Sequence, residues 1–214
     1  GRAVAVARSL LAARPALAAA FTLFGSPVTW LEVAAFWIAL AMVLANFRVH
    51  PVAWPLAIVS SLLYGLLFLD SRLYGEAALQ LVFVAVALWG WWQWLRGTTG
   101  DGSPLRVRRM APRERALVAA LTLAAWPLLG WLLDRFTDSD VPYLDALPTV
   151  GSLAGQLLLG RKLIENWAVW IAVNIFSVAL FATKGLWLTV LLYALFAVLS
   201  VVGWRAWRRL EAAR

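Results

Sequence analysis

Long apolar stretches follow one another along the chain and are separated by short polar or charged segments. Seven of them are predicted to be helices, near residues 29–46, 51–69, 74–95, 116–133, 146–160, 167–183 and 185–204. About 20 mainly apolar residues are needed for a helix to cross the hydrocarbon core of a bilayer. The stretches lack the polar stripe that a surface helix of a soluble protein carries. The pattern therefore predicts an all-α integral membrane protein with seven transmembrane helices.

The composition supports this class and argues against a nucleic-acid partner. Hydrophobic residues make up 63% of the chain and charged residues 14%, whereas soluble domains carry about 25% charged residues. The net charge of +8 comes from arginines and lysines in the segments between the apolar stretches, not from a patch on a folded surface. Because the chain has no cysteine, disulfides and thiol chemistry are excluded.

The basic residues also predict an orientation. If the stretches cross the membrane in alternation, most arginines and lysines fall on one side, around residues 48, 96–115, 161–162 and 205–214. The positive-inside rule places that side in the cytoplasm. We therefore expect the N-terminus outside and the C-terminus in the cytoplasm. The absence of cysteine fits a bacterial inner membrane. The segment 96–115, rich in Gly, Ser, Pro and Arg, is expected to be a mobile cytoplasmic connection.

The N-terminal segment is not predicted to span the membrane. Residues 9–24 are apolar but are interrupted by Arg14 and Pro15. An interfacial helix lying on the membrane is the preferred interpretation, and a signal peptide is the alternative.

The chain repeats itself after a shift of 113 positions. The shift places residues of the same type on each other: Trp54 on Trp167, Phe83 on Phe196, Gly90 on Gly203 and Trp94 on Trp207. Each copy holds three helices, and the stretch 116–133 has no counterpart. One extra crossing makes both copies enter the membrane from the same side, as in the SWEET sugar transporters. The prediction is a 3+1+3 parallel repeat with five parts: an N-terminal interfacial segment 1–28, a first repeat 29–96, a basic loop with a linker helix 97–144, a second repeat 145–210 and a tail 211–214.

Polar and aromatic residues gather at the start of the stretch 167–183. Trp167, Trp170 and Asn174 have the spacing i, i+3 and i+7, which places them on one helix face. Asn166 lies one turn before Trp170. Polar groups inside a membrane usually face a bundle or a cavity and are functional candidates. The alternatives are an interfacial-belt position for Trp167 and a helix–helix hydrogen bond for Asn174.

Two further amides and a tyrosine are candidates. Gln80 and Tyr193 coincide under the shift, so they are expected at one height on opposing helices. Gln156 follows Gly151 and Gly155, a pair of small residues that lets a neighbouring helix come close. For this segment the alternative is helix packing alone.

Other conspicuous residues have simpler interpretations. Six tryptophans near helix ends beside arginines are assigned to the interfacial belt: Trp89, Trp91, Trp92, Trp94, Trp204 and Trp207. The acids Glu32 and Asp145 coincide under the shift at the starts of two helices, where the helix dipole stabilises negative charge.

The candidate residues suit a flat ring with polar substituents. Indole faces attract aromatic and above all cationic rings, and amides both donate and accept hydrogen bonds. A carboxamide or ribose hydroxyls would satisfy them. Because no arginine or lysine lies in the middle of an apolar stretch, phosphate is disfavoured. The chain also lacks a nucleophile–base set and a mid-membrane carboxylate pair, so an enzyme is disfavoured. No cofactor or metal site is expected.

The motif Gln156-x4-Arg161-Lys162-x2-Glu165-Asn166-Trp167-x2-Trp170-x3-Asn174 resembles the PnuC family of bacterial vitamin transporters. The resemblance extends from Trp30 to Trp207 and includes Trp54-Pro55, Leu73-Tyr74, Gln80, Gly90 and Trp94. It implies a SWEET-like fold, a homotrimer and facilitated diffusion without ATP. It also implies that a cytoplasmic kinase traps the substrate by phosphorylation. The substrate site that it suggests comprises Trp167, Trp170, Asn174, Gln156, Gln80, Asn166 and Tyr193.

The resulting hypothesis is uptake of nicotinamide riboside by alternating access. The two indoles, Trp167 and Trp170, would stack on the pyridinium ring, and Asn174, Gln156 and Gln80 would bond the amide or ribose. Thiamine, riboflavin or another nucleoside remain alternatives within the same fold. An alternative of another class is a membrane assembly protein that transports nothing.

Overall fold

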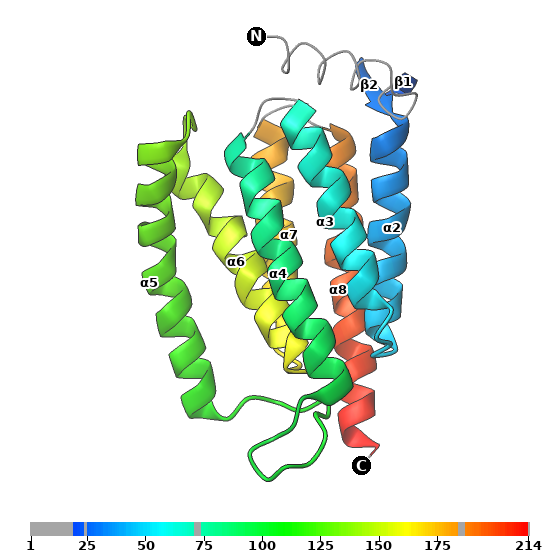
Figure 1. Ribbon diagram of the computed structural model, residues 1–214, viewed down its shortest axis with the longest axis vertical. Coiled ribbons are helices and arrows are strands. Elements are labelled where there is room, and N and C mark those ends of the chain that lie inside the picture. Colours follow the sequence, from blue (N-terminus) through cyan, green and yellow to red (C-terminus); the bar gives the residue numbers. More distant parts are fainter. Residues whose placement is uncertain (1–18, 24, 71–73, 184–186, 214) are drawn as a thin grey trace.

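The computed structural model describes residues 19–23, 25–70, 74–183 and 187–213. Within them the chain forms a short hairpin followed by seven long helices (Figure 1). The elements are β1 (Ala19–Leu23), β2 (Ser26–Thr29), α2 (Trp30–Phe47), α3 (Ala53–Asp70), α4 (Tyr74–Arg96), α5 (Pro112–Phe136), α6 (Pro142–Gly160), α7 (Asn166–Thr183) and α8 (Trp187–Ala212). The seven predicted helices correspond to α2 through α8.

The helices have the length and surface of membrane helices. In the described residues, five are long and apolar enough to cross a bilayer: α2, α4, α5, α7 and α8. α3 adds the shorter apolar stretch Ala53–Leu66. Large apolar side chains face outward, with Trp37 61% and Leu123 67% exposed. An apolar outer surface is compatible with lipid, and a helix also satisfies its backbone hydrogen bonds internally, as the membrane core requires.

The contacts join six helices into a closed ring, and α5 stands to one side of them (Figure 1). α2 packs on α3, α3 on α4, α4 on α6, α6 on α7, α7 on α8, and α8 on α2. We call α2–α4 the first bundle and α6–α8 the second bundle. Shifting the sequence by 113 positions maps the helix pairs α2–α3 and α3–α4 of the first bundle onto α6–α7 and α7–α8 of the second. It also maps the α4–α6 contact onto the α8–α2 contact.

A tryptophan packed on a glycine joins the last two helices of each bundle. Trp54 of α3 lies over Gly90 of α4, and Trp167 of α7 lies over Gly203 of α8. A Cβ atom added at Gly203 would lie 2.5 Å from the Trp167 ring, and one at Gly90 would overlap the Trp54 ring. Glycine is therefore required at both positions so that the helices can pack closely.

Each of these indoles meets a second tryptophan edge to face. The pairs are Trp54 with Trp94, at 5.4 Å between ring centroids, and Trp167 with Trp207, at 5.7 Å. Trp94 donates its indole N–H to the carbonyl of Leu159 at 3.0 Å, and Trp207 donates to the carbonyl of Asn46 at 2.8 Å. Leu159 and Asn46 are themselves 113 positions apart, so each bundle anchors its last helix on the other bundle.

The belt assignment of Trp94 and Trp207 is therefore wrong. These side chains are 7% and 0% exposed, and each indole N–H has a carbonyl partner inside the protein instead of an interfacial one. Charged neighbours in the sequence do not reveal which face of a helix end a side chain occupies. The other four tryptophans in that group are at least partly exposed: Trp89, Trp91, Trp92 and Trp204.

The described part of the N-terminal segment is a strand, so the predicted interfacial helix is wrong over residues 19–23. β1 pairs antiparallel with β2, with Phe21 opposite Val28. Gly25 has a φ of 83°, a left-handed conformation that glycine adopts at no steric cost and that reverses the chain. Residues 9–18 and 24 of the predicted helix, and Leu73 of the family motif, lie outside the described residues.

The α4–α5 loop, expected to be mobile, is fastened to the α6–α7 turn. Three of its apolar side chains are buried: Leu105, Val107 and Met110. The backbone N–H of Arg108 donates to the carbonyl of Lys162 at 3.2 Å, and the carbonyl of Arg108 accepts from Ile164 at 3.0 Å. Hydrogen bonds to Glu114 raise the pKa of Arg108 above its usual value. A composition typical of loops did not reveal these apolar anchors.

Two further sets of hydrogen bonds stabilise the same loop. The backbone N–H of Met110 donates to both carboxylate oxygens of Glu165, at 3.0 and 3.1 Å. At the tip, hydrogen bonds from the Thr99 hydroxyl and from Ser103 lower the pKa of Asp101 to about 2. The connection between the bundles is thus an ordered part of the fold.

Candidate functional site

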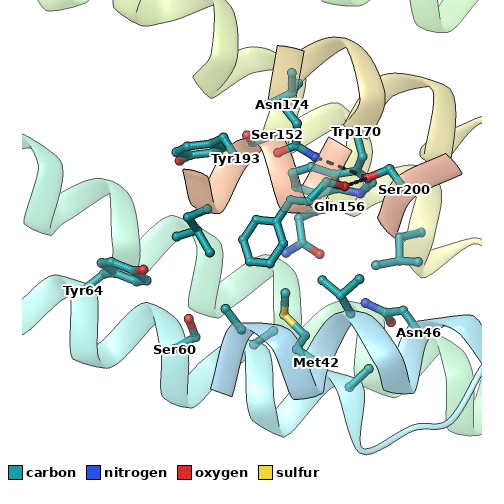
Figure 2. Close-up of a pocket in the computed structure, with 18 of the residues that line it drawn as sticks. Met42, Asn46, Ser60, Tyr64, Ser152, Gln156, Trp170, Asn174, Tyr193 and Ser200 are labelled. Carbon is teal, nitrogen blue, oxygen red and sulfur yellow. Dashed lines mark hydrogen bonds between the residues drawn. The ribbon is translucent and has the colours of Figure 1, made fainter. Parts of the chain in front are cut away.

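A cavity of about 540 Å³ lies between the two bundles. Along α2 its lining extends from Glu32 to Asn46, a rise of roughly 21 Å at 1.5 Å per residue. Figure 2 shows Met42, Asn46 and Ser60 of the first bundle facing Gln156 and Trp170 of the second. All seven residues predicted for the site line this cavity: Gln80, Gln156, Asn166, Trp167, Trp170, Asn174 and Tyr193.

The middle of the cavity carries the amides of the second bundle. Asn174 is 4% exposed, and its Nδ2 donates to Ser200 Oγ at 3.3 Å. The Ser200 hydroxyl in turn donates to the carbonyl of Phe196 at 2.7 Å. Asn174 thus makes the helix–helix hydrogen bond weighed above, between α7 and α8, while it also borders the cavity (Figure 2). Gln156 Oε1 is buried with no hydrogen-bond partner among the described residues.

The glycine pair of α6 brings α7 close and seats the tryptophan. A Cβ at Gly155 would lie 2.8 Å from the Trp170 ring, and a Cβ at Gly151 would lie 2.5 Å from Val173. Both glycines therefore serve packing. Packing at Gly155 also fixes the Trp170 indole, which is half-buried and borders the cavity.

The end of the cavity near the α2–α3 and α6–α7 turns, called the inner end below, is closed by tightly buried polar side chains. Asn166 is 0% exposed, and its Nδ2 donates to the carbonyl of Leu163 at 2.6 Å. Trp167 is 3% exposed and is enclosed by Phe47, at 5.6 Å between ring centroids, and by Trp207. Four atoms at this end are buried without a partner among the described residues: Asn46 Oδ1, Trp54 Nε1, Asn166 Oδ1 and Trp167 Nε1.

Aromatic rings and one acid line the opposite end, near the start of α2, which is called the outer end below. Phe181 and Tyr193 stack at 5.4 Å between ring centroids, and Tyr193 meets Phe196 edge to face at 6.5 Å. Glu32 closes a capping box, accepting the backbone N–H of Thr29 at 2.6 Å. The helix-start interpretation of Glu32 fits this geometry, but the carboxylate also borders the cavity.

The charge of the cavity is negative. Among the described residues that line it, none is a lysine, arginine or histidine, and Glu32 is the single carboxylate. The described residues hold no group of three His, Cys, Asp or Glu side chains suited to a metal ion. The arrangement can bind a neutral or cationic molecule through ring stacking and amide hydrogen bonds.

Several lining residues were not predicted. They are Glu32, Phe36, Met42, Asn46, Ser60, Tyr64, Ser152, Phe181, Phe196 and Ser200, among others. Asn46 is an amide inside an apolar stretch, so the rule that selected Asn174 would have selected it too. The serines and apolar residues carry no such signal, because both types are common in helix interfaces.

The fold is that of a multi-pass membrane protein with a cavity between two helix bundles. Residues 29–209 match the family model described as nicotinamide mononucleotide transporter. The chain belongs to this family of transporters, and it is not an enzyme.

The chain is similar to two named transporters and to one solved structure. It is 25% identical to the nicotinamide riboside transporter PnuC of Escherichia coli (strain K12), over 70% of this chain and 73% of that protein. It is 30% identical to the riboflavin/roseoflavin transporter RibM of Streptomyces davaonensis, over 88% of this chain and 89% of that protein. The crystal structure of the vitamin B3 transporter PnuC superposes with a TM-score of 0.70 and 26% identity, covering 85% of this chain and 81% of that one.

Proposed function

We propose that this protein takes up nicotinamide riboside by facilitated diffusion. The observation that carries the proposal is the cavity between the bundles, which combines buried amides and aromatic rings with no cationic side chain among its described lining residues. The pyridinium ring of the riboside can stack on the aromatic rings, and its carboxamide can form hydrogen bonds with the amides. The phosphate of a mononucleotide would find no arginine or lysine there to pair with.

Trp170 is the residue proposed to stack on the pyridinium ring. Its indole is half-buried at the cavity wall, whereas the Trp167 ring is enclosed and leaves its unpaired Nε1–H as the group available to a ligand. Asn174, Gln156 and Gln80 would bond the carboxamide or the ribose. Asn166 and Tyr193 would complete the inner and outer ends of the site.

The proposed mechanism is rocking of the two bundles about the cavity, within a 3+1+3 parallel repeat of the SWEET type. The first repeat would comprise residues 29–96 and the second 145–210, with 97–144 connecting them. Equivalent ring-closing contacts, α4 on α6 and α8 on α2, support this symmetry. Such a pair of like interfaces can open on either side of a central site.

The proposed setting is a bacterial inner membrane, with the N-terminus outside and the C-terminus in the cytoplasm. The α4–α5 loop and the C-terminus lie at the same end of the molecule (Figure 1), and both are rich in arginine. Net uptake would then depend on a cytoplasmic kinase that phosphorylates the riboside. A homotrimer is proposed with it, and the apolar outer surface of α5 is free to face lipid or a neighbouring copy.

Riboflavin is the second candidate cargo. The relative that is 30% identical over 88% of this chain is named a riboflavin/roseoflavin transporter, and a cavity of about 540 Å³ also admits a larger ring system. The negative charge of the lining favours the cationic riboside over neutral riboflavin.

The test is calorimetric titration of the purified protein with nicotinamide riboside, riboflavin, thiamine and nicotinamide mononucleotide. We expect saturable binding of the riboside, and none of the mononucleotide. Trp170→Ala should abolish riboside binding, while Trp92→Ala, which removes an indole that is 55% exposed on the outer surface, should not. Binding of riboflavin alone would identify riboflavin as the cargo instead of the riboside. Unchanged riboside affinity in Trp170→Ala would refute the proposed site.

A further inference from the structure

We infer that Glu32 is the residue that makes this cavity prefer a positively charged ring to a neutral one. The inference rests on the proposed function, because it concerns how the same cavity distinguishes its cargo. It assigns to Glu32 a role in substrate choice beyond its role at the start of α2.

The carboxylate is held in place at the outer end of the cavity. Thr29 and Glu32 bond reciprocally: the Thr29 N–H donates to Glu32 Oε2 at 2.6 Å, and the Glu32 N–H donates to Thr29 Oγ1 at 3.2 Å. The capping box therefore fixes the side chain relative to α2. Because α2 forms one wall of the cavity, the charge is fixed relative to the ligand path as well.

No cation among the described residues lies within ion-pair distance of Glu32. The ion pairs in the described part of the chain are Arg108–Glu114, Arg109–Glu211 and Arg115–Glu165. All three involve the α4–α5 loop or the start of α5, at the opposite end of the helices (Figure 1). A single negative charge in an apolar wall interacts more strongly with a ligand charge than it would in water.

The cavity is built to hold a ligand, independently of Glu32. Asn166 Oδ1 and Gln156 Oε1 are buried without hydrogen-bond partners among the described residues. Buried polar atoms are almost always paired in folded proteins, so unpaired ones that border a cavity point to a missing partner. A ligand in contact with these amides lies in the same cavity as the carboxylate.

The second bundle supplies a natural comparison. Asp145 is the counterpart of Glu32 under the shift of 113 positions, and it too lies in the first turn of its helix. It accepts a hydrogen bond from Ser139 Oγ at 2.6 Å and does not border the cavity. A role at the helix start is thus shared by both acids, whereas of these two only Glu32 also borders the cavity.

The experiment compares two ligands that differ in ring charge. Nicotinamide riboside has a pyridinium ring, and its 1,4-dihydro form has the same carboxamide and ribose on a neutral ring. Affinities of both are measured by calorimetry for the wild type, Glu32→Gln, Glu32→Asp and Asp145→Asn. The Glu32→Gln side chain keeps an oxygen that can accept the Thr29 N–H, so the helix start is preserved while the charge is removed.

We expect Glu32→Gln to weaken binding of the pyridinium form by roughly tenfold and to leave the dihydro form unchanged. Glu32→Asp should retain most of the preference, and Asp145→Asn should bind both ligands as the wild type does. Equal weakening for both ligands, or an unchanged ratio between them, would overturn the inference and leave the proposed function standing. A folded wild type that binds no riboside would instead overturn the proposed function, and the inference with it.

Discussion

Val49 and Lys162 occupy equivalent positions in two turns of the same structure, and both have left-handed backbone, with φ values of 53° and 56°. The Val49 N–H donates to the carbonyl of Asn46 at 3.1 Å, and the Lys162 N–H donates to the carbonyl of Leu159 at 2.9 Å. Left-handed backbone is uncommon for residues other than glycine. Its recurrence 113 positions apart shows that the sequence repeat extends to the backbone of the α2–α3 and α6–α7 turns.

The two turns differ in what holds them. In the α6–α7 turn, Lys162 Nζ donates to the carbonyl of Leu105 at 3.1 Å and lies 5.5 Å from the centre of the Trp94 ring. Arg161 donates to Gln93 Oε1 at 3.1 Å. The α4–α5 loop therefore fastens the second turn, and among the described residues it makes no such bonds to the first. We expect the α2–α3 turn to move more easily than the α6–α7 turn when this end of the protein opens.

Replacing Glu165 by alanine should loosen the α4–α5 loop. The change removes the acceptor of the buried Met110 N–H and the partner of Arg115, which lies 3.0 Å away. An unpaired buried donor costs about 1–3 kcal/mol. We expect trypsin to cleave the loop faster than in the wild type. Gel electrophoresis of the detergent-solubilised protein measures the rate of cleavage.

The matched control is Glu211→Ala, which breaks the exposed pair between Arg109 and Glu211. Surface pairs contribute between zero and about 1 kcal/mol, so cleavage should remain close to that of the wild type. Equal cleavage of the two variants would show that Glu165 does not fasten the loop.

Replacing Gly90 or Gly203 by alanine should destabilise the protein. In each variant the new methyl group would overlap the tryptophan seated on the glycine, and forcing extra volume into a packed core costs roughly 1–3 kcal/mol. Thermal unfolding in detergent measures the loss. Gly100→Ala is the control, because nothing lies within 4 Å of a Cβ there. A wild-type melting temperature for Gly203→Ala would contradict the packing described for Trp167.

Much of the fold follows from the sequence because membrane helices depend mainly on local hydrophobicity. The all-helical class and the seven helices were predicted correctly for this reason. The seven candidate site residues also meet at one cavity, since polar groups in apolar helices have few other places to point. Trp94 and Trp207 were misassigned because their hydrogen bonds join helices far apart in the chain. The α4–α5 loop was misjudged because its anchors, Leu105 and Met110, are ordinary apolar residues.

Replacing Trp94 or Trp207 by phenylalanine should cost similar amounts of stability. Each change removes one buried indole N–H bond across the bundle interface, to Leu159 or to Asn46. A net loss of about 1 kcal/mol per hydrogen bond is typical. Thermal unfolding of the two variants checks the expectation, with Trp92→Phe as the exposed control. A large difference between Trp94→Phe and Trp207→Phe would argue against equivalent interfaces.

Replacing Asn46 by leucine should stabilise the protein and impair its transport. Asn46 Oδ1 is buried with no partner among the described residues, and leaving such a group unpaired costs about 1–3 kcal/mol. Its counterpart in the second bundle is Leu159, so leucine fits the equivalent place in this architecture. A stable protein that keeps an unpaired amide beside a cavity retains it for a purpose other than stability. The amide is then expected to act when the cargo or water reaches the inner end.

The measurement combines thermal unfolding in detergent with uptake of labelled nicotinamide riboside into proteoliposomes. For Asn46→Leu we expect a higher melting temperature and slower uptake. The reciprocal variant, Leu159→Asn, buries a new amide and should unfold at a lower temperature. If Asn46→Leu instead melts earlier than the wild type, the amide is already paired in the folded protein. Asn46 would then serve the stability of the fold. The amide would have no role in passage of the cargo through the inner end of the cavity.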